Sequence, residues 1–96
     1  MVKISEEYED LLNWSKGKLK IEEFCNKWVP LLYKVNPEDK SYTLACIDLL
    51  FSLTERNDRT LYNWLSGRAK PPADIERMLH FVDLAWNFHY SFRSPR

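Results

Sequence analysis

Apolar residues recur at helical spacing in one segment after another, and this pattern restricts the fold of the chain more than any other feature. The clearest run is Ile21, Phe24, Cys25, Trp28, Val29 and Leu32. Their spacing places them on one face of an amphipathic helix. Pro30 lacks a backbone donor and clashes with the preceding turn, so we expect this helix to kink or stop near Trp28.

Two further helix starts precede the middle of the chain. Ser5, followed by two glutamates and by apolar residues at helical spacing, predicts a short first helix that ends at Gly17. The sequence Asn36-Pro37-Glu38-Asp39 combines a capping side chain, a proline and two acids, so a third helix is expected to begin there or at Ser41. From Tyr42 to Leu53 the residues are apolar nearly all round, which predicts a helix at the centre of a bundle.

Glycine and proline delimit the last two predicted helices. Leu61, Trp64 and Leu65 mark one face of a short helix that stops at Gly67, since glycine accepts the left-handed conformation that ends helices. Pro71 and Pro72 then favour a new helix start. Its main apolar face carries Ile75, Met78, Leu79, Val82, Ala85, Trp86 and His89. A second face, either core or a dimer surface, carries Phe81, Leu84, Phe88 and Phe92.

The chain has 96 residues, with neither a convincing alternating strand nor an internal repeat. We therefore predict a single all-α domain over residues 1–96, a small helical bundle of about five helices. Lys plus Arg and Asp plus Glu number 14 each, so any charged partner must be met by a local patch. Cys25 and Cys46 fall at apolar helical positions, which indicates buried reduced thiols. With no signal peptide and no membrane-spanning run, a cytoplasmic protein is expected.

Catalytic chemistry is the poorest interpretation. His80 and His89 lie nine residues apart, or about 13.5 Å along a helix, which is too far to share a metal. Paired acids lie in predicted first turns, where the helix dipole explains them. No converging nucleophile, base or ligand set is found, so we expect neither an enzyme nor a metal or cofactor site.

The short helix at 58–66 suggests a binding surface instead. Opposite its apolar face, Arg59 and Asn63 stand one turn apart, together with Tyr62 and Ser66. Arginine spans the two acceptors of guanine, and asparagine pairs with the acceptor and donor of adenine in a major groove. The alternative is an ordinary surface helix that carries these two side chains.

The run RTLYNWLSGRAKPP resembles the recognition-helix segment of the Cro and lambda-repressor type (XRE-type) helix-turn-helix family. The residues that carry the resemblance are Asn57, Thr60, Leu61, Trp64, Gly67 and Pro71. It covers about a third of the chain and implies a helix-turn-helix motif at about 41–67, whose second helix enters the groove. One departure is the turn, where Glu55 and Arg56 replace the family's glycine and apolar residue, so the turn is either longer or differently built.

The resemblance implies double-stranded DNA as the partner and transcription regulation as the role. The residues expected to face DNA are Asn57, Arg59, Thr60 and Asn63. Phosphate contacts are expected from Arg56, Arg68 and Lys70, and Tyr62 is expected to contact a thymine methyl group or a phosphate, or to cover Leu65.

The rival interpretation is a helical adaptor that binds another protein without binding DNA. Neutral net charge and 15% aromatic residues suit such a use of the same scaffold. Its anchors, or those of a homodimer, are expected on the last helix at Phe81, Leu84, Phe88 and Phe92. A contiguous basic face made by Arg56, Arg59, Arg68 and Lys70 favours DNA, and a scattered set offset by acids favours the adaptor.

Overall fold

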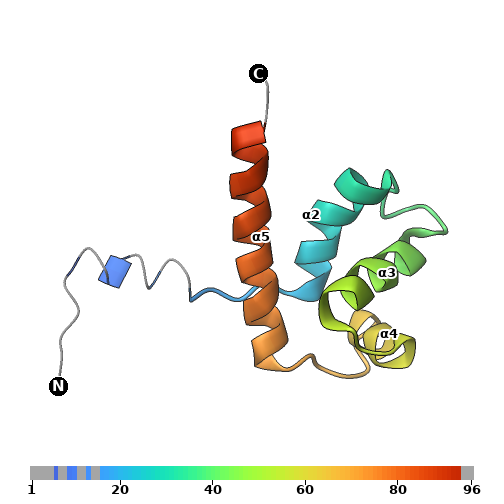
Figure 1. The fold of residues 1–96 in the computed structure, drawn as a ribbon. Helices are drawn as coiled ribbons and strands as arrows, with labels where there is room; N and C mark the ends of the chain where they lie inside the picture. The colour runs from blue at the N-terminus through green and yellow to red at the C-terminus, as the bar shows by residue number, and fades with distance from the viewer. Residues whose placement is uncertain (1–5, 7–8, 11–12, 14–15, 94–96) are drawn as a thin grey trace.

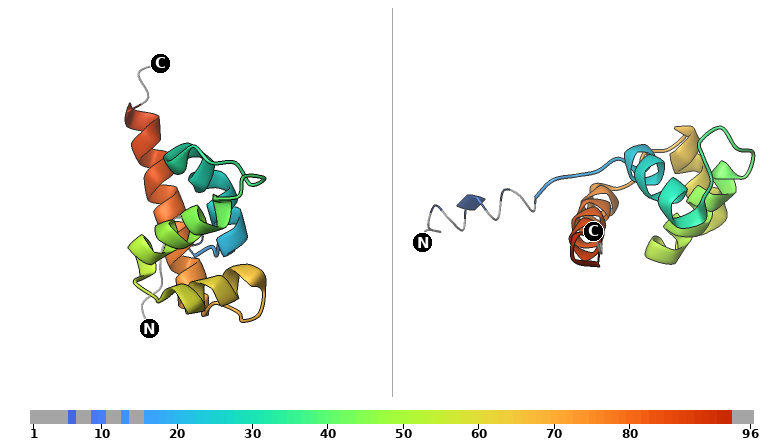
Figure 2. Two further views of the ribbon diagram at one scale, coloured as in Figure 1. Left: turned by 90° about the vertical axis from the view of Figure 1, so that its right-hand side faces the viewer. Right: turned by 90° about the horizontal axis from the view of Figure 1, so that it is seen from above.

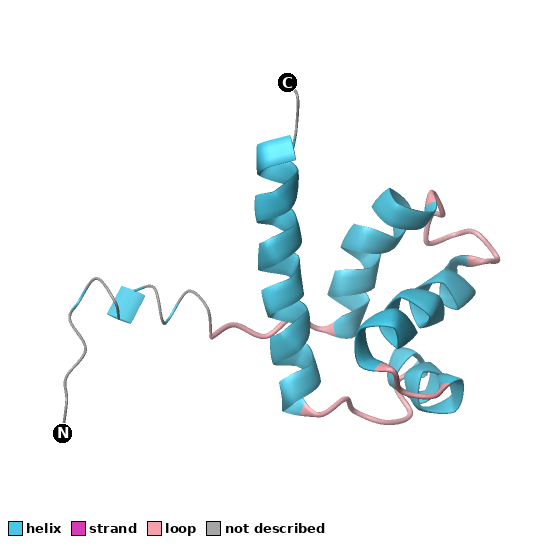
Figure 3. Ribbon diagram, viewed as in Figure 1, coloured by secondary structure: helices cyan, strands magenta, loops and turns pink. Residues whose placement is uncertain are grey.

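A computed structural model of the chain describes residues 6, 9–10, 13 and 16–93. The side chains of residues 92 and 93 lie outside the description, and so does most of the first expected helix at 5–17. The described part contains four helices rather than about five: α2 (Ile21–Tyr33), α3 (Tyr42–Thr54), α4 (Asp58–Ser66) and α5 (Ala73–Arg93) (Figure 1). Loops connect these helices and no strand occurs among the described residues, so the all-α class is confirmed there (Figure 3).

Helix α2 continues past the proline at which a kink or a stop was expected. The helix does not stop near Trp28, because it runs through Pro30 to Tyr33. Lys34 then adopts the left-handed conformation with φ 61°, and its backbone N–H donates to the carbonyl of Pro30 at 3.2 Å. Trp28 and Val29 just before the proline are fully buried, and Tyr33 after it packs against the core, so tertiary packing holds the helix together across the missing donor.

The core lies where α2, α3, α4 and the first half of α5 meet. Its largest fully buried side chains are Trp28 and Phe24, and both contact Trp86 of α5, with ring centroids at 5.1 Å and 5.7 Å. Cys25 and Cys46 are buried and free, as the sequence predicted. Burial of these aromatic rings is the main source of stability at the contact between α2 and α5.

Helix α3 begins at the later of its two expected starts. Asn36 and Asp39 form a separate turn, in which the Asp39 carboxylate accepts the Asn36 backbone N–H at 2.8 Å. The helix itself starts after Ser41. It is not enclosed on all sides as its composition predicted, since Leu44 is 70% exposed and Phe51 is 48% exposed. One face of α3 packs into the core and the opposite face is open.

The arrangement of the helices leaves α4 at the edge of the molecule. Figures 1 and 2 show α4 beside α3, with α5 standing next to α2 and extending past the bundle. A tight connection of three residues joins α3 to α4, and the chain then returns to α5. No helix of the described residues is both long and apolar enough to cross a bilayer.

Candidate nucleic-acid interface

The turn between α3 and α4 has three residues, Glu55, Arg56 and Asn57. Glu55 adopts the left-handed conformation with φ 58°, and its backbone N–H donates to Phe51. Thr54 closes the turn, because its hydroxyl donates to the Leu50 carbonyl at 2.8 Å and accepts the Arg56 N–H at 3.2 Å. A glutamate here takes the left-handed backbone conformation that glycine favours.

Asn57 fixes the start of α4. Its side-chain oxygen accepts the backbone N–H of Thr60 at 2.8 Å, which is the N-cap arrangement that stabilises a helix start. The oxygen of this predicted DNA-facing residue is therefore engaged within the protein, and the amide nitrogen of its side chain remains as a donor. Asp58 follows in the first turn, where its charge complements the helix dipole.

The two faces of α4 separate as the helical spacing predicts. Leu61 is fully buried and Trp64 is 6% exposed, which confirms both as core residues. On the opposite face Arg59 is exposed and Asn63 is half-buried. Neither of these two side chains has a hydrogen-bond or ion-pair partner within the described part of the chain.

Three other polar or aromatic side chains border the pair. Tyr62 is 48% exposed and Ser66 is exposed, whereas Thr60 is half-buried on the flank. Arginine and asparagine donors one helical turn apart, unpartnered and pointing away from the core, form a surface that can donate hydrogen bonds to an extended polar ligand.

Backbone hydrogen bonds at the end of α4 hold the segment that carries Arg68 against the helix. Gly67 has φ 84°, and the backbone N–H groups of Arg68 and Ala69 both donate to the Asn63 carbonyl, at 2.9 Å and 3.2 Å. This ending satisfies carbonyls of the last turn and turns the chain toward α2. It also fixes the position of Arg68 relative to Asn63.

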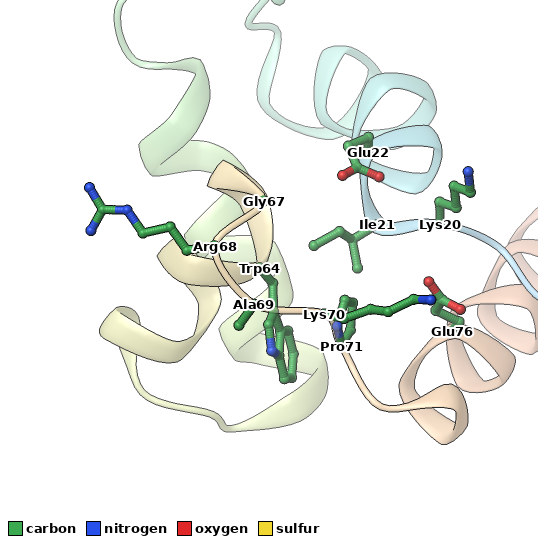
Figure 4. A pocket seen from close by; sticks show the side chains of 10 residues that line it. All are labelled: Lys20, Ile21, Glu22, Trp64, Gly67, Arg68, Ala69, Lys70, Pro71 and Glu76. Atoms are coloured by element: carbon green, nitrogen blue, oxygen red, sulfur yellow. The ribbon is translucent and has the colours of Figure 1, made fainter.

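An open hollow of about 630 Å³ lies between this ending and the starts of α2 and α5 (Figure 4). Its charged lining residues are Lys20, Glu22, Arg68, Lys70 and Glu76. Figure 4 shows Arg68 pointing away from the hollow, whereas Lys70 extends across it toward Glu76. Lys20 was missed from the sequence because nothing in the spacing of the chain brings residue 20 near residue 70.

The predicted cations therefore fall into two groups at opposite ends of α4. Arg56 and Arg59 lie at its start and alternate with the acids Glu55 and Asp58. Arg68 and Lys70 lie beyond its end, near the acids of the hollow. The set is scattered and partly offset, so the electrostatic attraction for a polyanion is modest.

A second candidate surface lies on α5. Phe81 is 53% exposed and Phe88 is 65% exposed, with the half-buried Leu84 between them on the face opposite Leu79. The side chain of Phe92, the fourth predicted anchor, is outside the description. Three apolar side chains at helical spacing on one open face form a docking surface for another apolar helix face.

Ionisable groups on α2 and α3 meet at one further point. The Tyr33 hydroxyl donates to the Asp48 carboxylate at 2.6 Å. Burial, followed by this hydrogen bond and the charge of Asp48, raises the pKa of Tyr33 to about 12. Within the described residues, no three His, Cys, Asp or Glu side chains are grouped as metal ligands.

Comparisons of the chain with protein-family models, with curated proteins and with solved structures found no significant match. Inferences about function therefore depend on the residues and geometry described above.

Proposed function

We propose that this chain is a DNA-binding helix-turn-helix protein that acts in transcription regulation, with α4 (residues 58–66) entering the major groove. The observation that carries the proposal is the outward, unpartnered pair Arg59 and Asn63 on a helix that follows α3 after three residues. A turn of this length between two packed helices is typical of the helix-turn-helix motif.

Base reading is assigned to α4. Arg59 suits the two acceptors on guanine, and Asn63 suits the acceptor and donor on adenine. The exposed Tyr62 is available to a thymine methyl group or a phosphate. Thr60 and the side-chain nitrogen of Asn57 reach the flank of the same surface and would contribute hydrogen bonds there.

Phosphate contacts are assigned to Arg56, Arg68 and Lys70. These positions flank α4 on both ends, which is where the two backbones of a groove run past an inserted helix. Glu55 and Asp58 reduce the local positive potential at the start of α4. With about 3 to 4 phosphate contacts, one copy of the domain binds weakly and with a shallow salt dependence.

A direct test is a gel shift of mixed-sequence duplex DNA over a series of salt concentrations. The proposal predicts a complex at low salt that weakens as salt increases, because counterions are released on binding. Complete absence of binding at low salt would contradict it. A matched protein with Arg56, Arg68 and Lys70 changed to alanine should bind more weakly and lose most of the salt dependence.

The second candidate is a protein-binding adaptor, and the open apolar face of α5 favours it. Exposed Phe81 and Phe88 are anchors of the kind that dominate protein interfaces. The offset charges around α4 suit this function as well. A gel shift that remains negative while a Phe81→Ser and Phe88→Ser double variant loses a partner or self-association would favour the adaptor.

A further inference from the structure

Helix α3 has a second apolar face that remains largely open, since only Ile47 of its three residues packs against the core. Leu44, Ile47 and Phe51 follow one another at three and four residues, so they form a single stripe along the helix. The stripe lies opposite the core residue Leu49 of the same helix. Leu44 is 70% exposed and Phe51 is 48% exposed. Single exposed apolar residues are common on protein surfaces, whereas a continuous exposed stripe indicates an interaction site.

A shallow hollow of about 230 Å³ follows this stripe, and its polar lining is acidic. Asp48 comes from α3, and Asp58 comes from the first turn of α4. None of the described residues that line the hollow is basic. The other residues that line the hollow are the apolar Leu44, Ile47 and Phe51.

One of the two carboxylates is held in place. The Tyr33 hydroxyl donates to Asp48 at 2.6 Å, which fixes that side chain beside Ile47 and Phe51. Asp58 is exposed in the first turn of α4, and its backbone is set by the start of that helix. The apolar stripe and the Asp48 carboxylate are therefore preorganised, which lowers the entropy cost of binding.

We propose that this surface, made of Leu44, Ile47, Phe51, Asp48 and Asp58, binds an amphipathic helix of a partner protein with an apolar face flanked by lysine or arginine. Helices that dock in grooves use apolar anchors at this spacing. Negative charges beside an apolar stripe select a partner with positive flanks and reject one with acidic flanks. The same two carboxylates repel phosphates, so DNA is not the ligand of this face.

The inference is independent of the proposed DNA binding, because its surface consists of the outer face of α3 and Asp58 at the start of α4 and includes none of the base-reading residues. The test uses a short fluorescent peptide with a leucine face and lysine flanks, and a matched peptide with glutamate in place of lysine. Binding of each to the full chain is measured by anisotropy. The lysine peptide is expected to bind at least about tenfold more tightly than the glutamate peptide.

Variants locate the binding site. Leu44→Ser removes an exposed anchor without opening the core, so folding is retained and affinity for the lysine peptide should fall about tenfold. Asp58→Asn should reduce the preference for lysine over glutamate. Leu31→Ser is the control, because it removes an exposed leucine of α2 that belongs to neither proposed surface and should leave peptide affinity unchanged.

Three results of the peptide experiments would overturn the inference. They are no binding of the lysine peptide, equal binding of both peptides, or a loss of binding in Leu31→Ser that Leu44→Ser does not show. Sedimentation without peptide completes the test, since self-association abolished by Leu44→Ser would identify a second copy as the occupant and contradict the proposed partner.

Discussion

Asp83 of α5 accepts a hydrogen bond from the indole Nε1–H of Trp28 in α2 at 2.9 Å. The same carboxylate oxygen lies 2.8 Å from the ammonium of Lys27, which also lies over the Trp28 ring at 5.2 Å. Because Trp28 is fully buried, its indole donor depends on this one acceptor. Asp83 therefore connects the aromatic contact between α2 and α5 to the polar surface.

Asp83→Ala should destabilise the domain by about 1–3 kcal/mol, since the buried indole N–H loses its acceptor. Urea unfolding followed by tryptophan fluorescence measures the change. Asp74→Ala is the matched control, because Asp74 is an exposed acid in the first turn of the same helix. Equal midpoints for the two variants would show that the bond to Trp28 contributes nothing.

The left-handed residues that end α3 and α4 predict opposite effects for two substitutions, one that introduces glycine and one that removes it. Gly67 has φ 84° with no atom within 4 Å of an added Cβ, so Gly67→Ala should cost about 1 kcal/mol through backbone conformation alone. Glu55 has φ 58°, so Glu55→Gly should stabilise by about 0.5–1 kcal/mol. Thermal unfolding checks both, and shifts of the same sign would contradict this account of the turn.

Titration of Tyr33 gives a prediction at high pH. Its pKa is raised to about 12 from the ordinary 10.0, so the folded state favours the neutral phenol. The resulting stabilisation is fully present below pH 10.0 and is lost as the pH rises through about 12.

The pKa of Tyr33 is measured from tyrosinate absorbance over a pH series, as the difference between wild type and Tyr33→Phe. Asp48→Asn should lower the pKa of Tyr33 only in part, because burial, the largest single cause, remains. If Tyr33 of the native wild-type protein instead titrates at the ordinary tyrosine pKa of 10.0, the proposed effect of burial and Asp48 is wrong.

Local signals in the sequence predicted α4 most closely. Asn57 as the cap and Gly67 as the stop both act on the backbone beside them, and Leu61 and Trp64 confirm the expected core face. The sequence did not decide how the turn between α3 and α4 is built. Its backbone is set by the packing of α3 on α4, and Glu55 therefore adopts a conformation that its identity does not favour.

Features that depend on distant packing could not be predicted. Burial of Trp28 and Val29 carries α2 past Pro30, although proline alone indicates a stop. The apolar composition of α3 suggested enclosure, but composition does not say whether a helix lies over Leu44 and Phe51. The separation of the four cations at the ends of α4 likewise follows from the return of the chain after Gly67.

The central claim is that Arg59 and Asn63 read bases. Duplexes enriched from a random pool by the wild-type protein provide the preferred site, and anisotropy at fixed salt measures affinity for it. Arg77→Ala, which removes an exposed cation on α5, is the control for loss of charge.

Arg59→Ala and Asn63→Ala should each fold normally and lose about 1–3 kcal/mol of binding to that site, with relaxed sequence preference. Arg77→Ala should change the affinity little. If both α4 variants bind the enriched duplex as the wild type does, or lose no more affinity than Arg77→Ala, the major-groove assignment of α4 is wrong.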